Sequence, residues 1–251
     1  MNNKLSYRQK QHAERSFTQE ESAPEKEFIP LSEERKAQFE EGVVLFIDKP
    51  LHWTSFDVVK KVRSILRIKK VGHAGTLDPL ATGLLIICTG KYTKKINEYM
   101  AKEKEYVGSF TIGAVTKSYD LETEPEEFKE IAGITERSIR AATLGFMGEI
   151  KQVPPMYSAL KKKGIPLYEL ARKGTQLELE PRTVFIKSFE ITAVNLPEVV
   201  FNIVCSTGTY IRSIAHDFGK ILGCGAYLSK LRRTRIGEFT SKEAVSVDGF
   251  L

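Results

Sequence analysis

The loop over residues 72–83 constrains the fold more than any other part of the chain. It holds one carboxylate, Asp78, between glycines and a proline, and it leads directly into the apolar run Leu84–Cys88. An apolar run bounded by turn residues is typical of a buried strand. The sequence therefore places a carboxylate on a rigid turn at the mouth of a buried strand. Because Asp-Pro pairs also initiate turns, a purely structural role for Asp78 stays open at this point.

Strand and helix signals follow one another in mixed order along the rest of the chain. Apolar or alternating runs predict strands over 43–47, 106–114, 184–193, 199–206 and 226–239. Helical spacing predicts helices after the capping pair Thr54-Ser55 and over 93–100, 136–146, 166–173 and 209–222. This order predicts an α+β fold with a mixed, mostly antiparallel central sheet flanked by helices.

The first 41 residues differ in composition from the rest. They carry 7 Lys/Arg and 9 Asp/Glu, a net charge of −2, with scattered Phe and no sustained period. Such a segment has too little apolar surface to offset the entropy of ordering, so we expect a polar, flexible tail over 1–41. A helix over Glu33–Glu41 is possible within it. We expect ordered structure to begin at Gly42 and a single domain over 42–251.

Several classes of protein are disfavoured by what the sequence lacks. No run of about 18 apolar residues is present, so no membrane span is expected. The three cysteines form no C-x-x-C pair, which suits a reducing cytoplasm and argues against a structural zinc site. Gly90-Lys91 is not part of a phosphate-binding loop, because Leu85 stands where its first glycine would be. We therefore expect neither a metal nor a cofactor.

Positive charge is concentrated outside the first 41 residues. The remaining residues carry 38 − 7 = 31 Lys/Arg and 32 − 9 = 23 Asp/Glu, a net charge of +8. Segment 151–173 holds six of these cations against one acid, Glu169. Clustered cations suit a phosphate backbone, although a solvated surface of a soluble protein explains them equally well on charge alone.

Six short blocks appear in a characteristic order. They are 48–50 (Asp-Lys-Pro), 72–83, 104–106 (Lys-Glu-Tyr), 153–172, 207–212 (Thr-Gly-Thr-Tyr-Ile-Arg) and 231–234 (Leu-Arg-Arg-Thr). Together they resemble the motifs of the TruB-type tRNA pseudouridine-55 synthases, over residues 42 to about 240. The resemblance implies the pseudouridine synthase fold, with an RNA-gripping insertion around 123–180.

The resemblance also implies catalytic roles for four residues. Asp78 would be the catalytic carboxylate and Arg212 its partner, and a guanidinium beside Asp78 would keep it ionised in a pocket that excludes water. Tyr106 would stack on the extruded uracil, and Tyr210 would lie beneath the reacting site. A single carboxylate suffices for breaking and remaking a glycosidic bond, since the base never leaves the pocket. Without the resemblance, core packing or a surface ion pair would explain these side chains.

Five further residues are assigned to RNA binding by the same resemblance. His73 would contact RNA where the nucleotide is pulled out, and Lys161 and Arg172 would meet phosphates. Leu231 would line the uracil pocket. Lys49 is grouped with them in a supporting role, beneath the active-site floor. A hydrogen-bonded loop histidine, a solvated basic loop and a packed leucine are the ordinary alternatives.

The function implied by these motifs is isomerisation of uridine to pseudouridine at position 55 in the T-arm loop of tRNA. We expect a cytoplasmic monomer with tRNA as its partner and no cofactor. Many bacterial members continue into a small PUA RNA-binding domain, which we do not expect here because the chain stops at Leu251. Two alternatives stay open: a guide-RNA-dependent pseudouridine synthase, and a non-catalytic module that binds or folds RNA.

Overall fold

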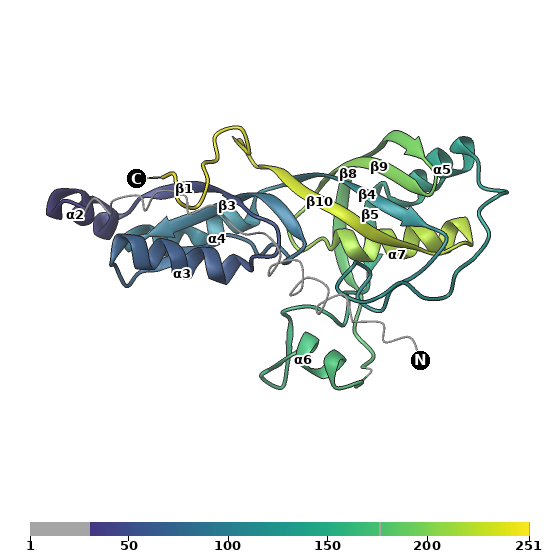
Figure 1. Cartoon of the computed structure of the whole chain (residues 1–251), viewed down its shortest axis with the longest axis horizontal. Coiled ribbons are helices and arrows are strands. Elements are labelled where there is room, and N and C mark those ends of the chain that lie inside the picture. The colour runs from purple at the N-terminus through teal and green to yellow at the C-terminus, as the bar shows by residue number, and fades with distance from the viewer. Residues whose placement is uncertain (1–30, 176, 251) are drawn as a thin grey trace, which may run out of the picture.

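A long, twisted sheet runs through the molecule (Figure 1). The structure is a computed structural model that describes residues 31–175 and 177–250, and within these residues the sheet has nine strands. Seven of them follow the order β1-β3-β10-β4-β9-β8-β5, with β2 added beside β3 and β11 beside β10. Among the described strands β10 pairs with β3 in parallel, and the other pairings are antiparallel. The predicted mostly antiparallel α+β fold is confirmed.

The strands of this sheet are β1 (Val44–Lys49), β2 (Val71–His73), β3 (Ala81–Thr89), β4 (Lys104–Ile112), β5 (Gly148–Gln152), β8 (Arg182–Asn195), β9 (Glu198–Cys205), β10 (Ala226–Ile236) and β11 (Phe239–Thr240). The α-helices are α2 (Glu33–Glu41), α3 (Ser55–Leu66), α4 (Ile96–Ala101), α5 (Glu136–Ala142), α6 (Leu167–Arg172) and α7 (Ile211–Leu222). Two short 3₁₀ helices, η1 (Gly90–Lys95) and η2 (Thr143–Phe146), complete the set. Every predicted strand and helix has a counterpart here, with ends shifted by a few residues, whereas β2 and β5 were not predicted.

The core is divided between the two halves of the sheet. In one half α3 packs on β1 and β3, and in the other α5 and α7 pack on β4, β8, β9 and β10 (Figure 1). Phenylalanines fill the second half, where the rings of Phe110 and Phe201 lie 4.3 Å apart between centroids. The central strands β3 and β10 join the two halves, so residues at this junction are held from both sides.

Helix α3 forms where the sequence predicts it because its start and its apolar face are both encoded. Thr54 accepts a hydrogen bond from the backbone N–H of Asp57, and the Asp57 side chain accepts one from the backbone N–H of Thr54. Val58, Val62 and Leu66 follow helical spacing and are fully buried against the sheet. The helix therefore fixes the segment that leads towards the loop over residues 72–83.

Gly83 permits the close contact between β3 and β10. Its φ of +99° is open to glycine, and a Cβ at this position would lie 2.3 Å from the carbonyl oxygen of Arg233. The register pairs Gly83 with Arg233 on β10 and with Lys49 on β1. Any side chain at Gly83 would push β10 away from the end of the Asp78 loop.

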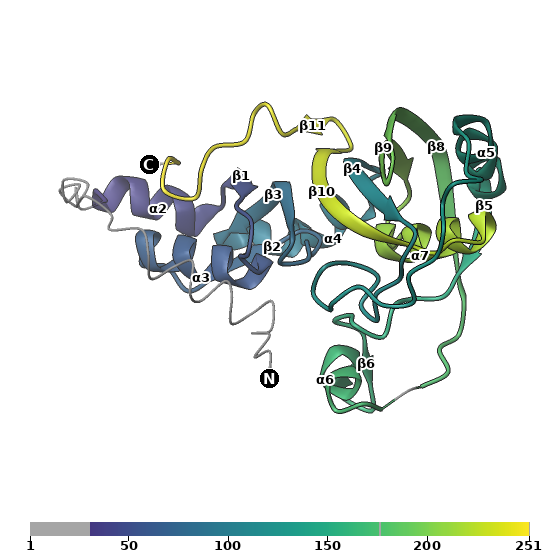
Figure 2. The same cartoon turned by 45° about the vertical axis from the view of Figure 1, so that its right-hand side comes forward.

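The basic segment leaves the sheet between β5 and β8. It forms the short hairpin β6 (Lys161–Lys162) and β7 (Ile165–Pro166), followed by α6, and both views show it standing away from the sheet (Figures 1 and 2). Its base returns to the body through Tyr157, Ala159 and Leu160, which lie near the sheet junction.

The N-terminal boundary differs from the prediction. Residues 33–41 form helix α2, which begins at the Ser32 cap and buries Phe39 in the core cluster that includes the apolar face of α3. Gly90 lets α2 lie close to η1, because a Cβ there would lie 2.0 Å from the Glu40 carbonyl oxygen. Ordered structure thus begins before Gly42. The expected flexibility of the preceding segment lies outside the described residues. No helix of the described part of the chain is long and apolar enough to cross a membrane.

Candidate active site

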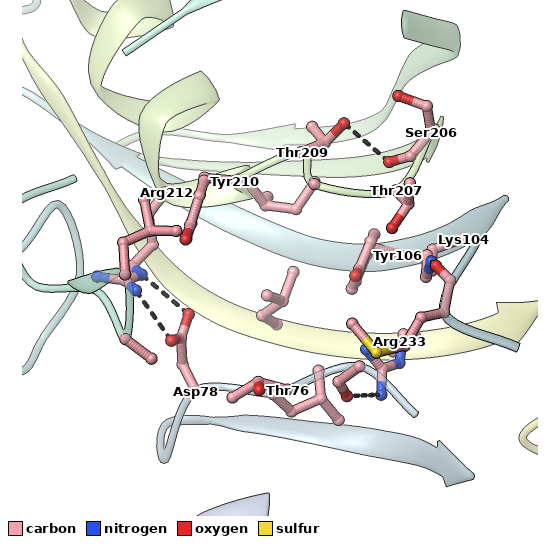
Figure 3. Close-up of a pocket in the computed structure, with 18 residues that line it drawn as sticks. Thr76, Asp78, Lys104, Tyr106, Ser206, Thr207, Thr209, Tyr210, Arg212 and Arg233 are labelled. Atoms are coloured by element: carbon pink, nitrogen blue, oxygen red, sulfur yellow. Dashed lines mark hydrogen bonds and ion pairs between the residues drawn. The ribbon is translucent and has the colours of Figure 1, made fainter. Parts of the chain in front are cut away.

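A cavity of about 350 Å³ opens at the junction of the two halves of the sheet (Figure 3). Its walls come from the loop before β3, the first residues of β4, the end of β10 and the 206–212 segment that leads into α7. Ala159 and Leu160, which lie where the basic segment meets the body of the protein, also line it. The cavity therefore draws on elements far apart in sequence and lies beside the most basic segment of the chain.

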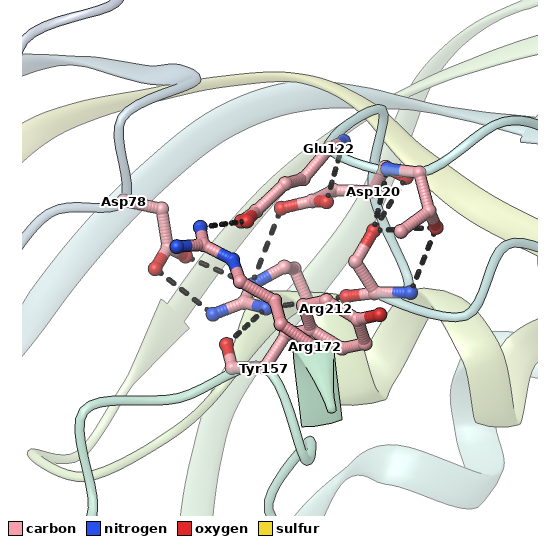
Figure 4. Close-up of polar contacts among 8 residues, drawn as sticks. Asp78, Asp120, Glu122, Tyr157, Arg172 and Arg212 are labelled. Carbon is pink, nitrogen blue, oxygen red and sulfur yellow. Dashed lines mark hydrogen bonds and ion pairs between the residues drawn. The ribbon is translucent and has the colours of Figure 1, made fainter. Parts of the chain in front are cut away.

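Asp78 lies at one end of this cavity and is held by Arg212. The guanidinium donates two hydrogen bonds to the carboxylate, from Nε to Oδ2 and from Nη2 to Oδ1, both 2.9 Å long (Figures 3 and 4). The Arg212 side chain is 3% exposed, whereas that of Asp78 is 33% exposed. A paired arginine buried behind a partly open carboxylate leaves that carboxylate fixed in orientation and accessible from the cavity.

The turn that carries Asp78 is anchored to the first turn of α3. The Ser55 hydroxyl accepts a hydrogen bond from the Leu77 backbone N–H at 2.8 Å, and the Asp78 carbonyl accepts one from Ala81 at 3.0 Å. The Pro79 carbonyl accepts a further bond from the backbone N–H of His52 at 2.8 Å. These bonds give the loop the rigidity that its glycines and proline suggest.

Arg212 also binds a second, more deeply buried carboxylate. Its Nε lies 3.5 Å from Oδ2 of Asp120, and its Nη1 donates to the carbonyls of Ser118 at 3.2 Å and Tyr157 at 2.8 Å (Figure 4). Burial raises the pKa of Asp120 above its ordinary value despite the neighbouring Arg212. Burial alone would lower the pKa of Arg212, but Asp78 and Asp120 outweigh it and raise that pKa. One guanidinium thus serves two carboxylates.

Two tyrosines and a leucine line the middle of the cavity. Tyr106 stands near the start of β4 and is 8% exposed, and Tyr210 precedes α7. The backbone of Tyr210 is clamped by the Gln152 side-chain amide through bonds of 2.8 and 3.1 Å. Leu231 on β10 lines the same cavity. Flat aromatic faces beside a fixed carboxylate suit a planar ligand such as a nucleobase.

The end of the cavity away from Asp78 is cationic. Lys104 lies there with 5% exposure (Figure 3). Its Nζ donates to the backbone carbonyls of Met100 and Lys102. Burial, with a contribution from Arg233, lowers the pKa of Lys104 to about 8. Arg233 is 1% exposed and ties β10 to the Asp78 loop, donating to Leu84 at 2.8 Å and to Gly75 at 3.0 Å.

The position of Lys49 fits the supporting role beneath the active-site floor that the resemblance implies, but not its grouping with RNA-binding residues. Its side chain is fully buried, and its Nζ donates to the carbonyls of Trp53 at 2.6 Å, Pro50 at 2.9 Å and Pro79 at 3.5 Å. Burial lowers the pKa of Lys49 to about 8, partly opposed by Asp78. Direct contact with RNA does not fit this environment. Lys49 instead supports the Asp78 loop from below.

The other predicted RNA-binding residues lie around the cavity rather than in it. His73 ends β2, and burial together with Arg233 lowers its pKa, which favours the neutral ring. Lys161 is exposed on the β6–β7 hairpin. Arg172 forms an ion pair with Glu122 (Figure 4). Its guanidinium also lies over the Tyr168 ring. Contact of these three residues with RNA stays a prediction.

Three buried residues of the site were not singled out from the sequence: Asp120, Lys104 and Arg233. Asp120 stands in a stretch with the composition of an acidic turn, and Lys104 and Arg233 lie in the blocks 104–106 and 231–234 but have no role of their own assigned there. Asp120 and Arg233 are buried beside partners that are distant in the chain, which local spacing does not reveal. The acceptors of Lys104 are the nearby carbonyls of Met100 and Lys102. Within residues 31–175 and 177–250, no group of three or more His, Cys, Asp or Glu side chains is placed to hold a metal ion.

Comparisons with known proteins agree with this geometry. Residues 63–211 match the model of the TruB family pseudouridylate synthase N-terminal domain, and residues 212–251 match the tRNA pseudouridylate synthase B C-terminal domain. A protein of Flavobacterium johnsoniae named tRNA pseudouridine synthase B is 52% identical over 220 residues, which cover 85% of this chain and 96% of that protein. A protein of the same name from Opitutus terrae is 49% identical over 206 residues, covering 82% and 85%.

Solved structures show the same fold. A chain in the crystal structure of a Cbf5-Nop10-Gar1 complex superposes with a TM-score of 0.65 at 31% identity, covering 84% of this chain. A chain in the structure of an H/ACA RNP bound to a substrate RNA containing 2′-deoxyuridine gives 0.63 at 29% identity. This chain spans about half the length of those two, 54% and 53%. The chain belongs to the TruB family of pseudouridylate synthases.

Proposed function

We propose that this chain isomerises uridine to pseudouridine in tRNA, at position 55 of the T-arm loop. The observation that carries the proposal is the Asp78–Arg212 pair, with two 2.9 Å hydrogen bonds, at the end of a cavity lined by Tyr106 and Tyr210. The names of its relatives, tRNA pseudouridine synthase B, support the same substrate.

The reaction breaks the N1–C1′ bond of uridine and forms a C5–C1′ bond, and the proton displaced from C5 ends on the released N1. The Asp78 carboxylate faces the ribose and acts on it in one of two ways: it attacks C1′, or it removes a ribose proton. Arg212 holds the carboxylate in place. In both routes the base turns over inside the cavity before it rejoins the sugar. Water is excluded from the cavity during this step and therefore cannot attack the sugar.

A uridine in a folded tRNA reaches Asp78 only when it leaves its stack. The cost of unstacking is a few kcal/mol, and stacking on an aromatic side chain returns about 1–3 kcal/mol per base. Tyr106 provides such a face whichever way the uracil points. The basic segment between β5 and β8 lies beside the cavity, and its Lys161 would bind phosphates of the T-arm loop around the flipped uridine.

Replacing Tyr106 should slow the chemistry more than it weakens binding. In Tyr106→Leu the aromatic face is lost while the apolar volume is largely kept, so we expect single-turnover pseudouridine formation to fall about 10- to 100-fold. The Kd for tRNA should rise less than about threefold, because most phosphate contacts lie outside the cavity. Tyr92→Leu, which changes a partly exposed tyrosine on η1, is the control. A Kd that rises as much as the rate falls would contradict this role.

Removing positive charge from the basic segment should reduce the salt dependence of tRNA binding. Each lost phosphate contact lowers the slope of log Kobs against log[salt] by roughly one unit, so Lys161→Ala should lower it by about one. Arg172→Ala should lower it less, because a phosphate has to displace Glu122 from Arg172. Lys220→Ala, which removes an exposed lysine paired with Asp217, is the matched control. Equal slopes for the Lys161 variant and the parent would place RNA elsewhere.

The decisive test uses the purified chain and unmodified tRNA transcript without any guide RNA. Pseudouridine at position 55, mapped by chemical sequencing, is the expected product. Activity that appears only with an added guide RNA would favour the guide-dependent alternative, and tight binding without product would favour the non-catalytic module.

Size-exclusion chromatography of the enzyme–tRNA complex tests the proposed monomer. The buried, unpaired thiols of the three cysteines support a cytoplasmic location.

A further inference from the structure

Tyr119 has a backbone conformation that is rare for an aromatic residue. Its φ is +64°, in the left-handed region that bulky side chains seldom adopt. The residues on either side of it both face Arg212: the Ser118 carbonyl accepts a hydrogen bond from Nη1, and the Asp120 carboxylate lies 3.5 Å from Nε. In extended backbone, neighbouring groups diverge. The reversal at Tyr119 is what turns a backbone carbonyl and a carboxylate towards one guanidinium.

The cost of this conformation is offset by contacts made by the same residue. The Tyr119 ring stacks on the His216 ring, with centroids 3.9 Å apart and an interplanar angle of 10°. The Tyr119 backbone N–H donates to Thr116 at 3.2 Å, and its carbonyl accepts from Leu228 at 2.9 Å. A strained residue persists only where its surroundings over-determine it, and such residues cluster at active sites.

His216 links the stack to the catalytic pair through helix α7. It stands four residues after Arg212 in that helix, so the two side chains are neighbours on one side of it. One helix therefore carries both the guanidinium and the ring that holds the turn facing it. Neither Tyr119 nor His216 lines the cavity. Their effect on the reaction has to pass through the position of Arg212 and Asp120.

We propose that the Tyr119–His216 stack is a positioning device for the Asp78–Arg212–Asp120 cluster, an inference that rests on the proposed function. The stack stabilises the left-handed turn, the turn aims the Ser118 carbonyl and the Asp120 carboxylate at Arg212, and Arg212 orients Asp78. Without the stack the turn relaxes, Arg212 loses acceptors on one side, and Asp78 is no longer held in a single orientation.

The test measures the single-turnover rate and the tRNA Kd for Tyr119→Ala, His216→Ala and the double variant. We expect each single variant to react about 10- to 100-fold more slowly, the range associated with misplacement of a reacting group by about 1 Å. The Kd should stay within about threefold, because neither Tyr119 nor His216 lines the cavity. The double variant should be no slower than the slower single variant, since both remove the same contact.

Conservative variants separate positioning from general destabilisation. Tyr119→Phe and His216→Phe keep two stacked rings and should recover at least half of the parent rate. Tyr119→Gly accepts the left-handed backbone without strain but lacks the ring, so we expect it to stay slow. Phe128→Ala, which removes a 78% exposed aromatic ring after the same loop, is the control with unchanged rate. If Tyr119→Ala does not fold, the His216 variants carry the test.

The outcomes distinguish this inference from the proposed function. A parent enzyme that makes no pseudouridine in tRNA overturns the proposed function itself. With an active parent, alanine variants that react at the parent rate overturn the positioning role. A Tyr119→Gly variant at the parent rate, or a double variant whose two rate losses multiply, overturns it as well.

Discussion

Asp78→Asn should abolish turnover while leaving the shape of the site almost unchanged. Asparagine has the size of aspartate and keeps one acceptor for Arg212, but it carries no charge and presents an NH₂ group to the guanidinium. It can neither attack C1′ nor accept a ribose proton. We expect the rate of pseudouridine formation to fall by at least about 10⁴-fold, the scale seen when a catalytic acidic residue is neutralised in other enzymes. Affinity for tRNA should remain within about threefold.

Single-turnover assays on a tRNA transcript measure the rate, and filter binding measures the Kd of the same protein. Asp248→Asn is the matched control, because it neutralises a surface aspartate that is paired with Lys61. Its rate should equal that of the parent. Turnover by Asp78→Asn within tenfold of the parent would remove Asp78 from the chemistry. Loss of binding together with turnover would indicate a structural role for this loop.

Elements whose signals are local could be predicted from the sequence. Strand β4 follows from its alternation, and α3 follows from the Thr54 cap and the apolar spacing of Val58 and Val62. Strand β5 was missed because it pairs with β8 near the sheet edge and only Gln152 in it is buried, so it shows no apolar pattern. Helix α2 was doubtful for a similar reason, since Phe39 is its one buried residue.

Residues of the candidate site also differ in whether a local sequence signal marks them. The Gly- and Pro-bounded loop around Asp78 stands out locally, but Arg212 lies 134 residues further along the chain, and only the resemblance joined the two. Asp120 has no such signal, and Arg233 lies in the 231–234 block without a role assigned to it, because both act through burial beside distant partners. Lys49 is a mixed case, because its supporting role fits the structure whereas its grouping with the RNA-binding residues does not. A lysine is expected at the surface, and its burial is possible because three backbone carbonyls of neighbouring loops satisfy its donors.

The charges in the cavity are sorted along its length. Asp78 and Asp120 surround Arg212 at one end, while Lys104 and Arg233 stand at the other with backbone carbonyls as acceptors. At the first end the partly exposed Asp78 carboxylate faces the cavity, with Arg212 buried behind it, whereas Asp120 does not line the cavity. The cationic end suits the polar edge of the base or a phosphate. This arrangement gives a bound nucleotide a preferred direction.

Removing Arg212 should cost both activity and stability. In Arg212→Met the apolar stem is roughly preserved, but two carboxylates lose the guanidinium between them. Breaking a buried ion pair by removing one partner typically lowers the free energy of unfolding by about 3–5 kcal/mol, so we expect a loss of that size. The rate should fall by at least about 10³-fold, because Asp78 loses both hydrogen bonds that fix its orientation.

The stability loss should depend on pH in a definite direction. Burial already raises the pKa of Asp120, and loss of Arg212 raises it further. A carboxyl group with a higher pKa in the folded state binds its proton more tightly there. It therefore stabilises the fold as pH falls through the folded pKa and destabilises it as pH rises. The difference in unfolding free energy between parent and variant should thus be larger at about pH 8 than at about pH 5.5.

Urea unfolding at these two pH values measures the difference, and Arg232→Met is the matched control. Arg232 also makes a two-bond pair with an aspartate, Asp48, but the two side chains are 38% and 36% exposed. Water and salt screen such a pair, so its loss should cost less than about 1 kcal/mol. An Arg212→Met variant as stable as Arg232→Met at both pH values would mean that the Asp78–Arg212–Asp120 cluster is not held together by its charges. The geometry around Asp78 would then have to be maintained by the other hydrogen bonds of the loop, such as those with Ser55 and His52.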